Sequence, residues 1–167
     1  MELDTASQTQ KQPVLPTLVF GVVEVRRLQR ELEALDDYFS QNALRQPGKQ
    51  VALPRTSRLL DSLAGENHVN LLQAHERQSL AKFLQLVVAQ APNIHISFAA
   101  DPSSAFTAKL VSWLRSNIHP FALLQLGLQP NIAAGCVVRT PNRVFDFSLR
   151  QRFTDQHQLL LQALEAK

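Results

Sequence analysis

The spacing of the apolar residues changes at Pro92, and this change constrains the fold more than any other feature of the chain. Before Pro92, apolar residues recur every three or four positions, as on one face of a helix. After it, residues 94–98 alternate apolar and polar side chains and include β-branched residues, which is typical of a strand. The sequence therefore predicts an α+β fold, with an N-terminal helical region followed by a small β-α-β-β-β-α domain.

The longest predicted helix covers residues 17–45. Pro16 is suited to its first turn, and Gln46-Pro47-Gly48 ends it. A long apolar stripe runs along it: Leu18, Val22, Val25, Leu28, Leu32, Leu35 and Phe39. Such a stripe suits packing against another helix, either in this chain or in a second protein, and packing in this chain's own core is the simpler alternative.

Shorter elements fill the rest of the chain. Two more helices are predicted before Pro92, at 57–64, where Gly65–His68 breaks the pattern, and at 73–90. After Pro92 the pattern predicts strands at 94–98, 121–128, 132–139 and 143–147, and a helix that opens at Asp101-Pro102-Ser103 and ends near His119. A last helix follows, with Asp146 or Ser148 as its cap and Leu149, Phe153, Leu160 and Leu164 facing inward. The predicted regions are a disordered tail (1–13), a reduced helical domain (14–91) and an α/β domain (94–166).

Charge is distributed unevenly along the chain. Residues 1–93 contain ten Lys/Arg and ten Asp/Glu, whereas residues 94–167 contain seven Lys/Arg and four Asp/Glu, which accounts for the net charge of +3. The basic residues of the second half are scattered and form no dense stripe, which favours a solvated surface over a nucleic-acid interface. A small RNA-binding α/β domain stays open as an alternative.

Membrane and redox signals are weak. No uninterrupted apolar stretch approaches the ~20 residues that a spanning helix needs, so we expect any membrane association to come through a partner. The single cysteine, Cys136, lies in the apolar run 132–138, which is more typical of a small buried hydrophobe than of a nucleophile. A lone cysteine also fits a reducing cytoplasm.

Patterns that would indicate catalysis are missing from the sequence. It contains no glycine-rich phosphate loop and no Cys-x-x-Cys or His-x-x-x-His spacing. His68 and His75 are separated by a predicted turn, and His95 and His119 suit surface or capping positions. Ser103 suits a helix cap, and Trp113 lies at helical spacing with Phe106 and Leu110, as a core residue does. We therefore expect a protein that is not an enzyme and has no cofactor or metal.

One motif in the second half is specific. Pro130 and Ile132 form a turn, Gly135 precedes the apolar strand that ends Val137-Val138-Arg139, and Asp146-Phe147-Ser148-Leu149-Arg150 leads into the last helix. This pattern resembles the C-terminal signature of the ATP synthase delta subunit family, which includes the mitochondrial oligomycin-sensitivity conferring protein. Residues 59–72 and 75–90 look like the family's later N-terminal-domain helices.

The sequence also departs from the family pattern. The helical half is shorter than the family's six-helix domain and lacks its first helix, with the Tyr-Ala-x-Ala-Leu pattern, which helps to bind the N-terminal segments of the alpha subunits. Position 134 is Ala where the family usually has Gly, and Asn131 replaces the common Ser. The missing first helix affects the expected contact with the alpha subunits. The two single-residue differences leave the expected fold of the second half unchanged.

The resemblance implies a non-catalytic stator subunit that links the catalytic head of an F-type ATP synthase to its peripheral stalk. Residues 94–166 would bind the C-terminal helices of the b subunits as a helix in a groove. Arg139, Arg143, Arg150 and Arg152 would meet acidic residues at the rim, and Pro130, Gly135, Asp146 and Ser148 would be structural. The protein would be peripheral, on the cytoplasmic face of a bacterial membrane. An E-like stalk subunit of a V- or A-type ATPase is the nearest alternative.

Overall fold

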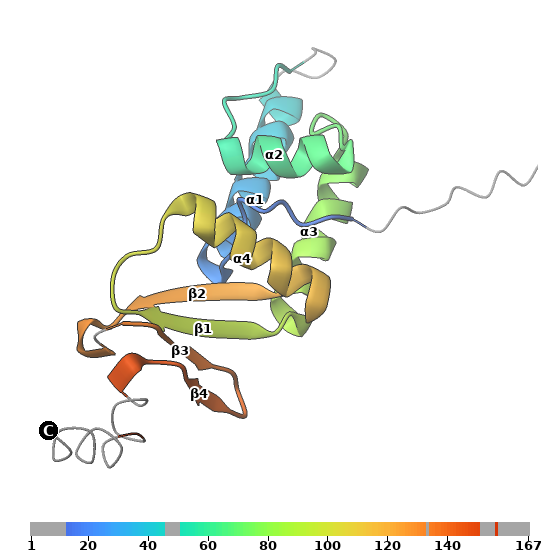
Figure 1. Cartoon of the computed structure of the whole chain (residues 1–167). Helices are drawn as coiled ribbons and strands as arrows, with labels where there is room; N and C mark the ends of the chain where they lie inside the picture. The colour runs from blue at the N-terminus through green and yellow to red at the C-terminus, as the bar shows by residue number, and fades with distance from the viewer. Residues whose placement is uncertain (1–12, 46–50, 133, 151–155, 157–167) are drawn as a thin grey trace, which may run out of the picture.

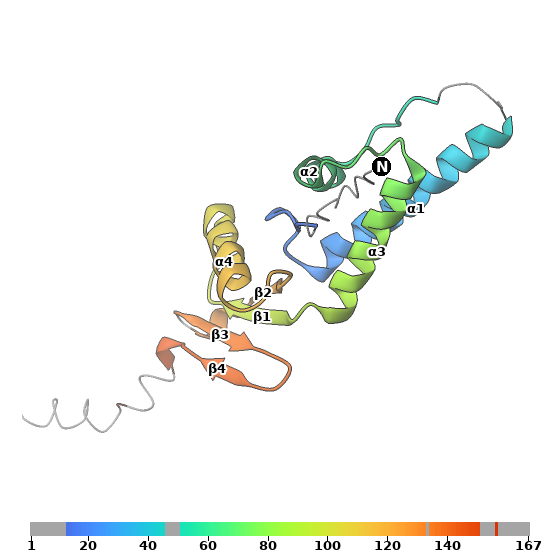
Figure 2. The same cartoon turned by 90° about the vertical axis from the view of Figure 1, so that its right-hand side faces the viewer.

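A computed structural model describes residues 13–45, 51–132, 134–150 and 156. Three helices precede a four-stranded mixed sheet, which one further helix covers in part (Figures 1 and 2). The elements are α1 (Val22–Arg45), α2 (Arg58–Asn67), α3 (Ala74–Gln90), β1 (Asn93–Phe98), α4 (Ser104–Asn117), β2 (Leu123–Leu128), the 3₁₀ turn η1 (Pro130–Ile132), β3 (Cys136–Arg139) and β4 (Val144–Asp146). The predicted α+β fold is confirmed.

The helical region is built on α1 and α3, which lie side by side and antiparallel (Figure 2), and α2 lies across them (Figure 1). The predicted stripe of α1 forms much of the contact, because Val25, Leu28, Leu32 and Leu35 are all buried. The helix α2 starts at Ser57, whose hydroxyl accepts a hydrogen bond from Leu60 N at 3.2 Å.

Two predicted helix boundaries in this region are wrong. The first helix begins at Val22 and not at residue 17, and Leu18 is 46% exposed. Instead, a turn closes between Pro16 and Val19, and the Phe20 carbonyl accepts a hydrogen bond from Leu124 in β2, which holds this segment against the sheet. Gly65 does not break α2 either. The helix continues to Asn67 and ends at His68, which adopts the left-handed conformation (φ 54°).

The sheet has the strand order β2-β1-β3-β4. Strands β1 and β2 are parallel and joined by α4, whereas β3 pairs antiparallel with both β1 and β4. The predicted strand at 132–139 starts late, because Pro130–Ile132 forms η1 and only Cys136–Arg139 is extended. Leu149 and Arg150 are helical, as the predicted last helix requires, but Phe153, Leu160 and Leu164 lie outside the described residues.

Two apolar clusters form the core, and they meet at β2. One cluster lies among α1, α2 and α3, and the other lies between α4 and the sheet. Leu123 of β2 belongs to the helical cluster, whereas its neighbour Leu124 belongs to the sheet cluster. Phe121 also contacts Phe83 of α3 edge to face, with ring centroids 5.4 Å apart. The helical region and the sheet therefore pack against each other along β2.

Candidate helix-binding groove and its supporting motif

An open apolar groove of about 350 Å³ lies between α4 and the sheet. The α4 wall is formed by Phe106, Leu110, Trp113, Leu114 and Ile118. The sheet supplies Ile94, Ile96, Phe98, Cys136, Val138, Thr140, Phe145 and Phe147. Thr140 is the one hydroxyl among these residues, so the groove offers a partner apolar contact almost exclusively.

The strand register explains why this floor is apolar. Ile96 of β1 pairs with Val138 of β3, which in turn pairs with Phe145 of β4, so the three residues form a row across the sheet. Side chains alternate between the two faces of a strand, and the polar neighbours His95 and Arg139 therefore point to the opposite face. His95 lies on the polar side of its strand, as predicted.

A single helix is too narrow to cover this sheet. Four strands spaced about 4.8 Å apart span about 14 Å between the outer two, whereas a helix with its side chains is about 10 Å across. In both views α4 lies along β1 and β2, and β3 and β4 lie farther from it (Figures 1 and 2). The apolar face of β3 and β4 is therefore only partly covered by the described elements.

Large aromatic side chains line the groove and stay accessible. Trp113 is 57% exposed and Phe147 is 59% exposed. The prediction that Trp113 packs in the core is wrong, because α4 turns Thr107, Val111 and Leu114 into the interior and leaves Trp113 on the groove side. Exposed clusters of this kind are uncommon on proteins that bind no partner.

Cys136 lies on the floor of the groove and is half-buried. Burial raises the pKa of its thiol, and the negative charge of Asp146 raises it further. The thiol is therefore held in its protonated form at neutral pH. It contributes apolar surface to the groove, as a small hydrophobe does, but it is half-buried where a buried position was predicted.

The four residues of the predicted structural motif come together at one end of the sheet. Pro130 starts η1, and Gly135 follows with a positive φ of 92°. The backbone of Phe147 and Ser148 packs directly against Gly135, where a Cβ atom would collide with the Phe147 carbonyl oxygen. Glycine is therefore needed for its conformation and for its lack of a side chain.

Asp146 and Ser148 organise the end of β4. The Ser148 N–H donates to Asp146 Oδ1 at 2.8 Å. Hydrogen bonds from the Ser148 side chain and backbone lower the pKa of the Asp146 carboxyl, and the nearby charge of Arg150 lowers it further. Leu149 N then donates to the Ala134 carbonyl at 2.9 Å, which ties the start of the last helix to the Gly135 loop.

The four arginines predicted to line the rim do not share one surface. Arg139 points to the sheet face opposite the groove, whereas Arg143 lies in the turn between β3 and β4, where its N–H donates to the hydroxyl of the groove residue Thr140 at 3.1 Å. Arg150 lies near Asp146. Arg152 is outside the described residues. Of these arginines, Arg143 is the one hydrogen-bonded to a residue that lines the groove, among those the structure describes.

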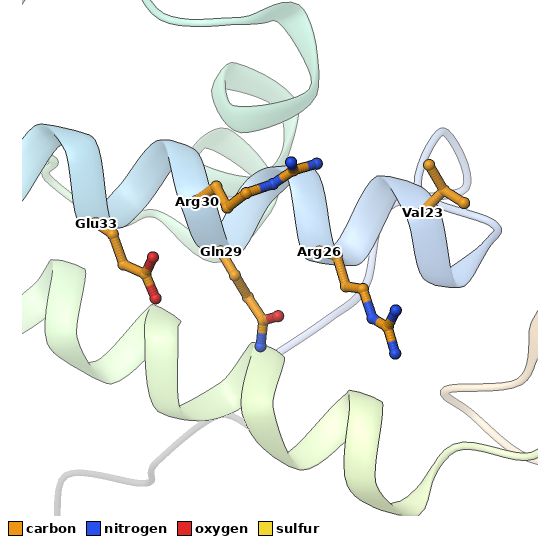
Figure 3. Close-up of a pocket in the computed structure, with 5 residues that line it drawn as sticks. All are labelled: Val23, Arg26, Gln29, Arg30 and Glu33. Atoms are coloured by element: carbon orange, nitrogen blue, oxygen red, sulfur yellow. The ribbon is translucent and has the colours of Figure 1, made fainter.

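A second candidate surface is the exposed side of α1. Val23, Arg26, Gln29, Arg30 and Glu33 line a shallow depression there, with Arg26, Gln29 and Glu33 extending toward α3 and Arg30 away from it (Figure 3). Val23 is 72% exposed. The side chains come from one helix and do not converge on a point, so this surface suits a protein contact better than a small ligand.

The histidine and serine side chains that the sequence singled out occupy turn and cap positions in the described part of the chain. No group of three or more His, Cys, Asp or Glu side chains could hold a metal ion there. His68 ends α2, His119 Nδ1 accepts a hydrogen bond from Phe121 N at 3.2 Å, and Ser103 caps α4. None of the described helices is long and apolar enough to cross a membrane.

Comparison with known proteins adds no assignment, since neither the protein-family models nor the curated proteins contain a match to this chain.

Proposed function

We propose that this chain is a non-catalytic stator subunit of the delta type, which links the catalytic head of an F-type ATP synthase to the b subunits of its peripheral stalk. The main support is the apolar groove between α4 and strands β3 and β4. The fold around it has the β-α-β-β-β order expected from the sequence motif. In this role the protein performs no chemistry and acts by holding two assemblies together.

The proposed occupant of the groove is the C-terminal helix of a b subunit. A groove walled by one helix and floored by a sheet accepts another helix lying beside α4, which would complete the cover over β3 and β4. Trp113, Phe145 and Phe147 are aromatic anchors of the kind that dominate binding energy when they become buried. Arg143 at the hairpin would favour acidic residues on the partner.

The contact with the catalytic head is assigned to α1, which takes the place of the family's missing first helix. Arg26, Arg27 and Arg30 are exposed, and no ion pair joins them to an acidic side chain in the described ranges. Their charge favours an acidic segment such as an alpha-subunit N-terminus. Binding there should weaken with salt, whereas binding in the apolar groove should persist.

The groove assignment is tested by calorimetric titration with the C-terminal segment of the b subunit from the same genome. Saturable one-to-one binding to the intact chain is expected. Phe145→Asp places a charge in the groove and should weaken binding by at least tenfold, because an unpaired charge would be buried. Leu86→Asp is the matched control, since Leu86 is an exposed apolar residue on α3 away from the groove.

Four results would reject the assignment. A folded chain that does not bind the segment contradicts it, and so does equal binding by both variants. Salt-sensitive binding to RNA in place of the segment would favour the RNA-binding alternative. Finally, if residues 151–167 already cover the groove, the chain would bind the segment only after a truncation that removes them. That result would assign the groove to the chain's own C-terminal residues.

A further inference from the structure

The outer edge of β2 is covered at Leu124 and open two residues later. Leu124 N donates to the Phe20 carbonyl at 2.7 Å, on the side away from β1. Leu123 N donates to the other side, to the Pro92 carbonyl just before β1, at 3.0 Å. Successive residues of a strand turn their backbone groups to alternate sides, so the N–H and carbonyl of Leu126 also point away from β1. Leu126 is therefore the next position at which another strand can pair with this edge.

Leu126 marks the point where the cover over β2 ends. Among the described residues, no hydrogen bond outside the pairing of β1 with β2 involves its backbone. Phe20 and Gly21 lie against Leu124, whose carbonyl oxygen is 3.2 Å from the place that a Cβ atom on Gly21 would take. The chain then enters α1 at Val22. Unpaired backbone groups on an outer strand are a template for pairing with another chain.

A cavity of about 450 Å³ opens beside this edge. Residues 20–24, at the start of α1, form one wall, and residues 124–126 of β2 form the other. Most of these side chains are apolar, and Glu24 is the one charged side chain among the described residues that line the cavity. A peptide strand pairing with Leu126 would place a neighbouring apolar side chain in the cavity, whereas Glu24 would repel an acidic one there.

The cavity is continuous with the basic surface of α1. Val23 lines both this cavity and the depression that contains Arg26 and Arg30 (Figure 3). Its side chain is 72% exposed, so a partner that lies along α1 can contact it on the way to β2. Arg30 lies two helical turns from Val23, about 10 Å along the axis. One short peptide can therefore span both surfaces, since an extended chain covers about 3.3 Å per residue.

We propose that the outer edge of β2 at Leu126 binds an extended stretch of the same partner segment that contacts α1. The partner is a peptide whose acidic residues face Arg26 and Arg30, and whose adjoining apolar residue enters the cavity beside Val23. Its backbone adds a strand to β2 through hydrogen bonds with the N–H and carbonyl of Leu126. The inference rests on the proposed contact between α1 and the catalytic head, and it adds a second contact that is directed by the backbone.

Exchange of amide protons with solvent, measured by NMR on the full chain, tests this contact. The probe is a synthetic peptide of the alpha-subunit N-terminal segment from the same genome. At saturating peptide, exchange of the Leu126 N–H should slow at least tenfold, because a new hydrogen bond protects it. The Val144 N–H is the matched control. It points away from β3 on the other outer strand, β4, and its exchange should not change.

Two matched substitutions on α1 test the cavity. Val23→Asp places a negative charge at its mouth and should weaken peptide binding at least tenfold, because that charge opposes the acidic residues and would be buried by the apolar one. The first turn of a helix tolerates an aspartate, so the variant should fold. Leu44→Asp adds the same charge at an 85% exposed position near the other end of α1, and it should weaken binding less than twofold. Equal weakening by both variants overturns the proposal.

The remaining outcomes separate this inference from the contact on which it rests. Peptide binding that shifts the Arg26 and Arg30 signals but leaves Leu126 exchange unchanged overturns the β2 contact alone. A folded chain that does not bind the peptide overturns both contacts. Slowed exchange at Leu126 that needs no peptide and increases with protein concentration would assign the edge to a second copy of the chain. Equal slowing at Leu126 and Val144 would show unspecific strand pairing, and either of these two results also overturns the proposal.

Discussion

Gly135 lies directly against the carbonyl oxygen of Phe147, so close that no side chain fits between them. This contact joins the loop before β3 to the residues after β4. It also brings the Ala134 carbonyl to the N–H of Leu149, where the last helix begins. The motif read from the sequence is therefore a point of close backbone approach that sets where the chain leaves the sheet.

Gly135→Ala should destabilise the protein. The new methyl group would meet the Phe147 carbonyl, and the left-handed backbone at φ 92° is strained for any other residue. The expected loss is about 2–4 kcal/mol in the free energy of unfolding, measured with urea. Gly65→Ala is the contrasting variant, because Gly65 lies within α2 with open space around it, and it should stabilise the protein by about 0.5–1 kcal/mol. Equal effects of the two variants would contradict this account.

Arg77→Met should loosen the contact between α3 and α1. The Arg77 side chain is buried, and its Nε donates to Asp36 Oδ1 at 2.5 Å while its guanidinium lies 4.5 Å from the ring centroid of Phe39. Its Nη1 also donates to the Leu71 carbonyl at 2.8 Å. Losing these contacts should lower the unfolding free energy by about 2–3 kcal/mol, whereas exposed Lys82→Ala should change it by less than about 0.5 kcal/mol.

The carboxyl group of Asp146 should make stability depend on pH in the acid range. Its pKa is lowered in the folded protein from the ordinary 3.8, chiefly by the Ser148 hydrogen bonds. A lowered pKa gives a stabilising contribution that is present above 3.8 and is lost as the pH falls through the folded value. Thermal unfolding at pH 7 and pH 3 should therefore differ less in Asp146→Asn than in the unaltered chain. An identical difference in both would show that this carboxyl makes no contribution.

The thiol of Cys136 should react slowly with iodoacetamide at pH 7.5. Its pKa is raised by burial, so the reactive thiolate is scarce, and the rate should increase as the pH is raised toward 9.5. Because Cys136 lines the groove, saturating b-subunit segment should slow the reaction further. Mass spectrometry of the alkylated protein measures both effects, and an unchanged rate with bound segment would place that segment elsewhere.

Spacing alone predicted the helices and strands best where contacts are local. The buried residues of α1 belong to the predicted stripe, and Ser103 caps α4 as predicted, whereas Ser57, predicted inside its helix, is the cap that precedes α2. The start of α1 was predicted wrongly because the backbone of residues 15–19 is held by hydrogen bonds from Arg115, about a hundred residues away. No local pattern records a contact at that distance.

The groove shows a different limit of sequence analysis. Helical spacing identified Phe106, Leu110 and Trp113 as one apolar face, but spacing cannot tell whether an apolar face is covered by the same chain. The strand order puts β3 and β4 on the side of β1 away from β2, and α4 lies along β1 and β2 (Figures 1 and 2). The one signal in the sequence that could have suggested this surface is an aromatic residue on a strand that the single helix is too narrow to cover.

The most direct test of the central claim uses the chain's single tryptophan, Trp113, which lies in the groove. Its fluorescence should be recorded while the C-terminal segment of the b subunit, chosen to lack tryptophan, is added. The account predicts a blue shift that saturates at one segment per chain, as the half-exposed indole becomes buried. Binding detected by calorimetry without any change in Trp113 emission, or no saturable binding to the folded protein, would contradict it.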